Sequence, residues 1–234
     1  MKNPIEFITT QDGTQFVGYP NDHLFSLIKN GETFVDAYVK DAIDRYVTPE
    51  SVCIDVGANL GYVSLYLAAK CRKVYSFEPQ PVVFLQLCAN LFLNQRLNVK
   101  PYNAGCHSKP CFIDFADYQS GWVGTGDFSD YSKIKSIGSV SMSQKADGKI
   151  LAVRLDDVIM GKVDFIKIDA QGADVDVILG AERIMREHHP VIIFEYEDDL
   201  SVKNYGRTLQ DLCDLTKSLG YKSQEVYPGN FLLT

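Results

Sequence analysis

Hydrophobic residues in the middle of the chain follow two alternating patterns. Short apolar runs fall at 51–56, 73–78 and 98–103, and each is bounded by glycine, proline or asparagine. The segments between them, 61–70 and 81–94, carry apolar residues at helical spacing. Short apolar runs between turn residues are typical of buried strands, whereas apolar positions three or four apart are typical of helices. This alternation predicts an α/β fold, with a mostly parallel, doubly wound sheet that has helices on both faces.

The same alternation resumes in the last third of the chain. There the pattern predicts strands at 150–153, 163–169 and 191–197, a helical turn within 154–159, helices at 173–188 and 209–220, and closing strands at 221–226 and 230–234. The helix at 173–188 carries Val175, Ile178, Leu179 and Ile184 on one side, as expected of a helix that packs on the sheet.

The first fifty residues precede this alternation. They predict two short strands within 5–19 around a turn at Asp12-Gly13, a short helix at 21–29 and a longer helix at 32–46. A chain of 234 residues fits one large α/β domain with small additions. We therefore expect an N-terminal cap segment, residues 1–50, on a single domain that spans residues 51–234.

The alternation is interrupted by an insertion at about 105–148. Residues 106–116 predict a hairpin, and residues 117–148 are rich in glycine, serine and aspartate. A loop of this length inside a domain is usually either functional or disordered. One interpretation is a surface loop without a role. The other is a substrate lid in which Trp122 and Phe128 cover the ligand, with mobility from Gly121, Gly124 and Gly126.

The chain is organised around Ser51–Gly61, SVCIDVGANLG, where a strand runs through a glycine turn into a helix. Gly57 and Gly61 permit close approach of a ligand to the backbone. The spacing is D-x-G-x-N-x-G and differs from the G-x-G-x-x-G turn that admits a pyrophosphate. The carboxylate of Asp55 suits a ligand with an ammonium group, such as S-adenosylmethionine. The alternative is an ordinary strand–loop–helix turn with incidental glycines.

Five polar residues lie at the ends of the predicted core strands, and parallel strands bring such residues to one edge of a sheet. They are Asp55, Glu78, Asn103, Asp169 and Glu195. Glu78 comes about twenty residues after the glycine turn, where a carboxylate accepts the two ribose hydroxyls of an adenosine. Its alternative role is to cap a helix. Asn103 and Ala104 would meet the adenine edge, or Asn103 is a turn residue.

Composition excludes several classes of function. The net charge of −7 and the pI of about 5.1 make a nucleic-acid partner unlikely. No apolar run approaches the roughly 18–20 residues of a membrane span, and the N-terminus lacks the features of a secretory signal. The six cysteines form no C-x-x-C pair, which argues against a zinc site and predicts a reducing, cytoplasmic location.

Together these motifs resemble the FkbM family of S-adenosylmethionine-dependent methyltransferases. The resemblance covers about residues 50–197 and rests on IDVGANLGYVSLYLA, YSFEPQP, the Asn90-x-x-x-Asn94 helix end, LDDVI, DFIKIDAQGADVDVILGA and IIFEYE. It implies the class I methyltransferase fold, which is Rossmann-like. It also implies methyl transfer from S-adenosylmethionine, typically to a hydroxyl oxygen of a sugar, a polyketide or a similar small acceptor.

By this resemblance, the methionine part of the cofactor would lie against the glycine turn, the ribose at Glu78 and the adenine near Asn103. The expected cofactor-binding residues are Asp55, Gly57, Ala58, Asn59, Gly61, Tyr62, Phe77, Glu78, Pro79, Asn103 and Ala104. The sequence departs from the family at IDAQGAD, where the family usually reads I-D-x-E-G-A-E. Gln171 replaces one acid and Asp174 shortens another, which favours an altered substrate contact.

Methyl transfer to a hydroxyl requires alignment of the two reactants and removal of one proton. Asp169 and Glu195 are the candidate bases, and Lys167 lies on the same strand face as Asp169. Lys167 would lower the pKa of Asp169 or of the acceptor, or form a buried ion pair with Asp169. Alternatively, Asp169 and Glu195 share Mg²⁺, which polarises the acceptor oxygen.

The histidines have weaker claims to a role. His107 lies near the third strand end and is a further candidate base, whereas His188 and His189 suit the C-terminal end of a helix. Two other functions remain open. A nicotinamide-dependent oxidoreductase uses a similar sheet, although Asp55 and Asn59 argue against it. A non-catalytic homologue that binds S-adenosylmethionine would be consistent with Gln171.

Overall fold

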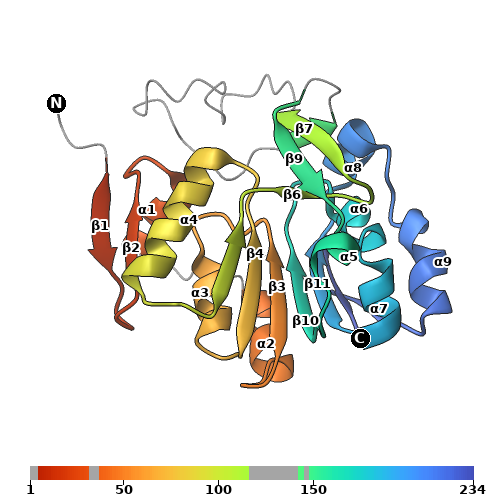
Figure 1. Ribbon diagram of the computed structural model, residues 1–234, viewed down its shortest axis with the longest axis horizontal. Coiled ribbons are helices and arrows are strands. Elements are labelled where there is room, and N and C mark those ends of the chain that lie inside the picture. Colours follow the sequence, from red (N-terminus) through yellow and green to blue (C-terminus); the bar gives the residue numbers. More distant parts are fainter. Residues whose placement is uncertain (1–4, 32–36, 116–141, 145–147) are drawn as a thin grey trace.

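A seven-stranded sheet forms the centre of the computed structural model, which describes residues 5–31, 37–115, 142–144 and 148–234 (Figure 1). Its strand order is β12-β13-β11-β10-β3-β4-β5. The strands are β3 (Val52–Val56), β4 (Lys73–Phe77), β5 (Val99–Tyr102), β10 (Phe165–Ile168), β11 (Val191–Glu195), β12 (Ser223–Tyr227) and β13 (Asn230–Leu233). The five neighbouring strands β5, β4, β3, β10 and β11 are parallel, and β13 pairs antiparallel with both β11 and β12. The predicted mostly parallel sheet is confirmed.

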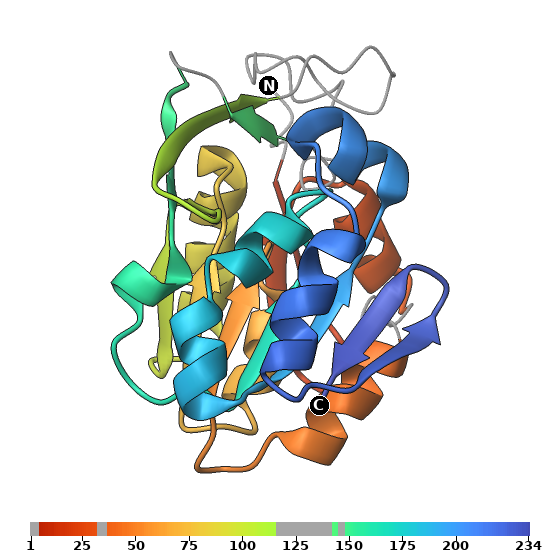
Figure 2. The same cartoon turned by 90° about the vertical axis from the view of Figure 1, so that its right-hand side faces the viewer.

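Helices cover both faces of this sheet (Figures 1 and 2). The helices of one face are α5 (Leu155–Val158), α6 (Asp174–Leu179), α7 (Glu182–His188) and α9 (Gln210–Ser218), and those of the other are α2 (Ala37–Tyr46) and α3 (Tyr62–Ala68). The first group packs in one apolar cluster around Ile166 and Ile192, and the second in another around Phe165 and Ile193. Neighbouring residues of a strand face opposite sides, so each buried strand supplies both clusters.

The N-terminal elements β1 (Glu6–Thr9), β2 (Gln15–Gly18) and α1 (His23–Lys29) pack against α4 (Pro81–Leu93). Helix α4 lies between this small sheet and β5 (Figure 1). Asn90 of α4 accepts a hydrogen bond from the Val17 backbone at 2.7 Å, and its amide donates to the Leu60 carbonyl. Asn90 therefore ties the N-terminal strands and the glycine turn to the same helix.

The insertion folds differently from its prediction. The two halves of the predicted hairpin do not pair with each other. Instead β6 (Gly105–Cys106) pairs with β9 (Ile150–Val153), and β7 (Cys111–Phe115) pairs with β9 and with β8 (Met142–Gln144). This second sheet has the order β6-β9-β7-β8, so the strand at 150–153 lies outside the central sheet. The predicted lid with Trp122 and Phe128 falls outside the described residues.

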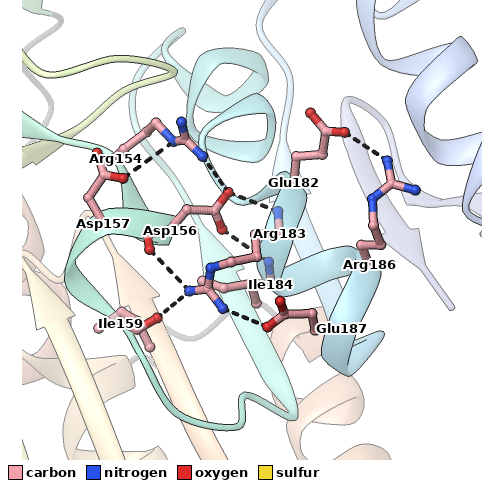
Figure 3. A network of polar contacts seen from close by, with 9 residues as sticks. All are labelled: Arg154, Asp156, Asp157, Ile159, Glu182, Arg183, Ile184, Arg186 and Glu187. Atoms are coloured by element: carbon pink, nitrogen blue, oxygen red, sulfur yellow. Dashed lines mark hydrogen bonds and ion pairs between the residues drawn. The ribbon is translucent and has the colours of Figure 1, made fainter.

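The prediction of a single helix at 173–188 is wrong, because the helix is interrupted between α6, which ends at Leu179, and α7, which begins at Glu182. A side chain at Gly180 would place its Cβ 2.3 Å from the His107 carbonyl oxygen, so this close approach requires glycine. The buried Asp156 carboxylate then accepts the backbone N–H groups of Arg183 and Ile184 at 2.8 and 3.0 Å (Figure 3). Side-chain oxygens at this position satisfy the unpaired amides of a helix N-terminus, so α7 starts afresh.

Helix α8 (Asp198–Tyr205) follows β11 and was not predicted. Its hydrophobic positions do not follow a helical period, and its only buried residue is Ser201. Tertiary contacts explain the helix. Arg207, just beyond it, donates two hydrogen bonds to the buried Asp176 carboxylate of α6, at 3.1 and 3.2 Å. This contact holds the end of α8 against α6.

Candidate active site

The glycine turn lies where the direction of strand addition reverses. From β3 the chain proceeds to β4 and β5 on one side, and later to β10 and β11 on the other. Ligands bind outside such a switch point, at the carboxyl ends of the strands. Gly57 has φ +72°, and a Cβ on it would lie 1.8 Å from the Asp169 carbonyl oxygen. Glycine is therefore required where the turns after β3 and β10 meet.

A hollow of about 640 Å³ opens beside this junction and is called the first hollow below. It extends from the ends of β3 and β4 to β6 and α8. Its lining comprises Val56, Gly57, Phe77, Glu78, Pro79, Gln80, Ala104, Gly105, Cys106, His107, Ile113, Asp169, Ala170, Gln171, Ala173 and Tyr205. Ligand sites in proteins are commonly lined in this way, by apolar groups with a few polar ones.

Glu78 supplies the buried carboxylate of the first hollow. Its Oε2 accepts the Asn59 N–H at 2.9 Å and its Oε1 accepts the Gln80 N–H at 2.8 Å. Burial raises the pKa of Glu78 to about 7, although these two hydrogen bonds favour the ionised form. The side chain thus links the glycine turn to the start of α4 and retains further lone pairs for hydroxyl donors.

Asn103 acts on the backbone at the end of β4. Its amide nitrogen donates to the carbonyl oxygens of Glu78 and Pro79, at 2.9 and 3.1 Å. The next residue, Ala104, is buried and lines the first hollow. In this arrangement the Asn103 side chain fixes the Glu78–Pro79 backbone, and the backbone after Asn103 forms the wall of the hollow.

Lys167 and Asp55 form a buried ion pair beneath the turn. Parallel pairing of β10 with β3 places these two residues side by side, and their Nζ and Oδ1 atoms are 3.5 Å apart. Lys167 also donates to the Gly57 carbonyl at 3.1 Å. Burial alone would lower the pKa of Lys167, but the charges of Asp169 and Asp55 outweigh it, so the pKa is raised. Asp55 is fully buried and also accepts a hydrogen bond from Ser64.

Asp169 follows β10, and its two carboxylate oxygens have different partners, one a hydrogen-bond donor and the other an ion-pair partner. Gln171 Nε2 donates to Oδ1 at 3.0 Å, and Lys167 Nζ lies 3.6 Å from Oδ2. The Gln171 backbone has φ +50°, a conformation that non-glycine residues seldom adopt. Asp174 holds this turn by accepting the N–H groups of Ala170 and Gly172. Both residues that depart from the family pattern therefore serve to position the Asp169 turn.

A second hollow, of about 460 Å³, lies on the side of the sheet covered by α2 and α3. It is lined by Tyr38, Val39, Val63, Lys167, Ile168, Asp169, Ile193, Phe194, Glu195 and Asn230. Glu195 is the last residue of β11. Burial and the nearby Asp169 charge raise the pKa of Glu195 to about 8. The raised pKa favours the protonated carboxyl group, which is a hydrogen-bond donor.

The structure gathers some of the predicted site residues and separates others. Those in the first hollow are Gly57, Phe77, Glu78, Pro79, Ala104 and Asp169, and those in the second are Lys167, Asp169 and Glu195. Asp55, Ala58, Asn59, Gly61, Tyr62 and Asn103 line neither hollow. The Tyr62 ring stacks on Phe16 of β2, at 5.8 Å between ring centres. Asp169 is the predicted residue that both hollows share.

Other lining residues were not predicted as part of the site. Tyr38 and Asn230 come from α2 and from the closing strand β13, far in sequence from every motif. Gln80 gave no signal of a binding role in the sequence, because a polar residue before Pro81 is expected at the start of a helix. His107, a weaker candidate, does line the first hollow, where burial lowers its pKa. Its Nε2 lies 3.8 Å from Asp176.

Three further expectations concern a metal ion, a membrane span and the two histidines at 188 and 189. Within the described ranges, no group of three or more histidine, cysteine, aspartate or glutamate side chains is placed to hold a metal ion, so the Mg²⁺ expectation gains no support. The same residues contain no helix that is long and apolar enough to cross a bilayer. His188 and His189 lie at the end of α7, away from both hollows.

The raised pKa of Glu78 predicts a pH-dependent stability difference. Between pH 4.5, its ordinary value, and about 7, the folded protein keeps a proton that the unfolded chain has lost, so rising pH favours unfolding. Glu78→Gln removes this titration. Relative to wild type, the variant should gain roughly 3 kcal/mol of unfolding free energy from pH 4.5 to 8. Urea unfolding across this range measures the gain, and a pH-independent difference would contradict the prediction.

The chain is similar to known methyltransferases and to part of a synthetase. A family model described as the methyltransferase FkbM domain matches residues 55–223. The chain is 28% identical over 224 residues to the AMB antimetabolite synthetase AmbE of Pseudomonas aeruginosa. This match covers 82% of this chain and 10% of that protein. It is 26% identical over 155 residues to methyltransferase sdnD of Sordaria araneosa, which covers 55% of this chain and 60% of that protein. The chain thus spans less than two thirds of either curated relative.

Among solved structures, SMU.1697c of Streptococcus mutans, in complex with S-adenosylhomocysteine (SAH), is similar with a TM-score of 0.51. The match covers 84% of this chain and 94% of that one, at 10% identity, and so concerns the fold alone. The fold is that of class I methyltransferases, as expected. Because the family model extends over more than half of the sequence, from β3 to the start of β12, the chain belongs to the FkbM methyltransferase domain family.

Proposed function

We propose that the protein transfers a methyl group from S-adenosylmethionine to a hydroxyl oxygen of a small acceptor, such as a sugar. The observation that carries this proposal is that Asp169 lines both hollows. A cofactor in the first hollow and an acceptor in the second would therefore both lie against Asp169. The family supports methyl transfer, and the six free thiols support a reducing compartment such as the cytoplasm.

The first hollow fits an adenosine-containing cofactor. Glu78 offers a carboxylate for the ribose hydroxyls, and Gly57 lets the turn after β3 lie directly against the Asp169 backbone in the wall of the hollow. Pro79 and Ala104 give flat apolar walls for a base. SMU.1697c, which shares the fold, was solved with SAH. When bound, S-adenosylmethionine would supply an electrophilic methyl group, so the protein has to align the reactants and handle one proton.

Asp169 is the proposed base. About 38% of its side chain is accessible to solvent. In this proposal it takes the proton of the acceptor hydroxyl. Glu195, whose raised pKa favours its protonated form, donates a hydrogen bond that orients the acceptor. Lys167 stays charged and balances Asp55 and Asp169, so the turn keeps its shape while the proton moves.

The test combines calorimetry with an acceptor screen. Wild type should bind both SAH and S-adenosylmethionine with micromolar affinity and should form SAH in the presence of a suitable alcohol or sugar. Asp169→Asn should lose roughly hundredfold or more in turnover. Glu195→Gln, which keeps a hydrogen-bond donor, should lose much less. Arg186→Gln, on the exposed surface of α7, serves as the control.

Each alternative function has its own signature in the same experiment. Binding of SAH without turnover on any acceptor would favour a non-catalytic homologue. Binding of NADH in place of SAH would favour a nicotinamide-dependent oxidoreductase. Absence of SAH binding would contradict the proposal itself.

A further inference from the structure

Gln80 is a buried side chain of the first hollow whose amide oxygen and nitrogen have different surroundings. It is the N-cap residue of α4 and is 2% exposed. Its Oε1 accepts the backbone N–H groups of Val82 and Val83, at 2.6 and 3.2 Å. Because both of these partners are donors, the amide cannot be turned around, and its nitrogen has to face away from the helix.

The amide nitrogen of Gln80 has no hydrogen-bond partner among the residues that the structure describes. A buried donor left without an acceptor is destabilising, so native proteins rarely contain one without a reason. A less demanding cap such as serine or aspartate would serve α4 without this cost. The position of Gln80 in the wall of the first hollow suggests that the missing acceptor belongs to a ligand.

The backbone around Gln80 leaves its side chain as the available donor. Pro79 has no N–H group, and the N–H groups of Gln80 and Asn59 are both bound by the Glu78 carboxylate. Glu78 and Gln80 both line the hollow, so its wall contains a carboxylate and, two residues later, an amide donor without a partner among the described residues. An adenosine has the matching groups, because its ribose hydroxyls donate and the ring nitrogens of its base accept.

We propose that Gln80 is a cofactor-binding residue whose Nε2 donates a hydrogen bond to a ring nitrogen of the adenine. The proposal rests on the proposed function, since it requires that the first hollow holds the adenosine part of S-adenosylmethionine. It assigns to Gln80 two roles at once. The amide oxygen caps the N-terminus of α4, and the amide nitrogen forms a hydrogen bond with the adenine.

Gln80→Glu separates these two roles, because glutamate keeps the length and the capping oxygen but removes the donor. The measurement is calorimetry with SAH and with its 1-deaza, 3-deaza and 7-deaza analogues, each of which replaces one ring nitrogen with a CH group. Wild type should bind one analogue about tenfold more weakly than SAH, the loss of one hydrogen bond. In Gln80→Glu the same analogue and SAH should bind equally.

Comparing analogues within each variant cancels any general effect of the new charge beside Glu78. Gln95→Glu is the matched control, since Gln95 is exposed just beyond the other end of α4, and it should keep the wild-type pattern. Gln80→Ser, which retains a cap but cannot reach the base, replaces Gln80→Glu if that variant does not fold.

The outcomes distinguish this proposal from the proposed function. If wild type binds SAH but every deaza analogue binds equally well, Gln80 does not read the base and the proposal is overturned. The same holds if the analogue pattern is unchanged in Gln80→Glu. If wild type binds neither SAH nor S-adenosylmethionine, the proposed function itself fails.

Discussion

Gly57→Ala is expected to weaken SAH binding by roughly hundredfold or more, as displacements of about 1 Å in a site commonly do. The added Cβ would lie 1.8 Å from the carbonyl oxygen of Asp169, which is backbone and cannot swing aside. The turns after β3 and β10 must therefore separate. This separation moves Asp169 away from the first hollow and disturbs the hydrogen bond from Lys167 to the Gly57 carbonyl. Calorimetry with SAH measures the loss.

Gly220→Ala is the matched control for this substitution. Gly220, at the end of α9, has φ +79°, close to the +72° of Gly57, but a Cβ there would meet nothing within 4 Å. Both variants should lose about 1 kcal/mol of stability through the left-handed backbone. Only Gly57→Ala should lose affinity. Equal SAH affinities in the two variants would show that the contact between the two turns does not shape the site.

Glu78→Ala is the second substitution with a large expected effect. We expect SAH affinity to fall by roughly a hundredfold to a thousandfold, because the two hydrogen bonds that we propose between the Glu78 carboxyl group and the ribose hydroxyls are lost. The variant also leaves the N–H groups of Asn59 and Gln80 without their present acceptor. Circular dichroism and thermal unfolding therefore accompany the calorimetry, so that affinity is measured on folded protein.

A ligand without the ribose 2′-hydroxyl separates recognition from general damage in Glu78→Ala. Wild type should bind 2′-deoxy-SAH about tenfold more weakly than SAH, whereas Glu78→Ala should bind the two alike. Glu182→Ala, which removes an exposed carboxylate of α7, should match wild type with both ligands. If Glu78→Ala still discriminates between them, the ribose lies elsewhere.

Much of the central sheet can be predicted from local patterns in the sequence. Apolar runs such as Val52–Val56 have to be buried, glycines and prolines mark where they stop, and right-handed connections leave few ways to assemble the strands. The start of α4 at Pro81 follows from the same rules, because proline is favoured in the first turn of a helix. These rules do not describe the insertion, whose strands pair across more than thirty residues, nor α8, which is held by Arg207 and Asp176.

The sequence by itself determined the parallel core, the glycine turn and the set of polar residues at the strand ends, because strand and turn preferences act between near neighbours in the chain. Only the tertiary structure decided how those residues meet. The register of β10 against β3 pairs Lys167 with Asp55, and Gly57 fixes the Asp169 backbone by direct contact. The direction of the Gln80 amide depends on two N–H groups of α4. Such contacts depend on distances between elements, which residue order does not specify.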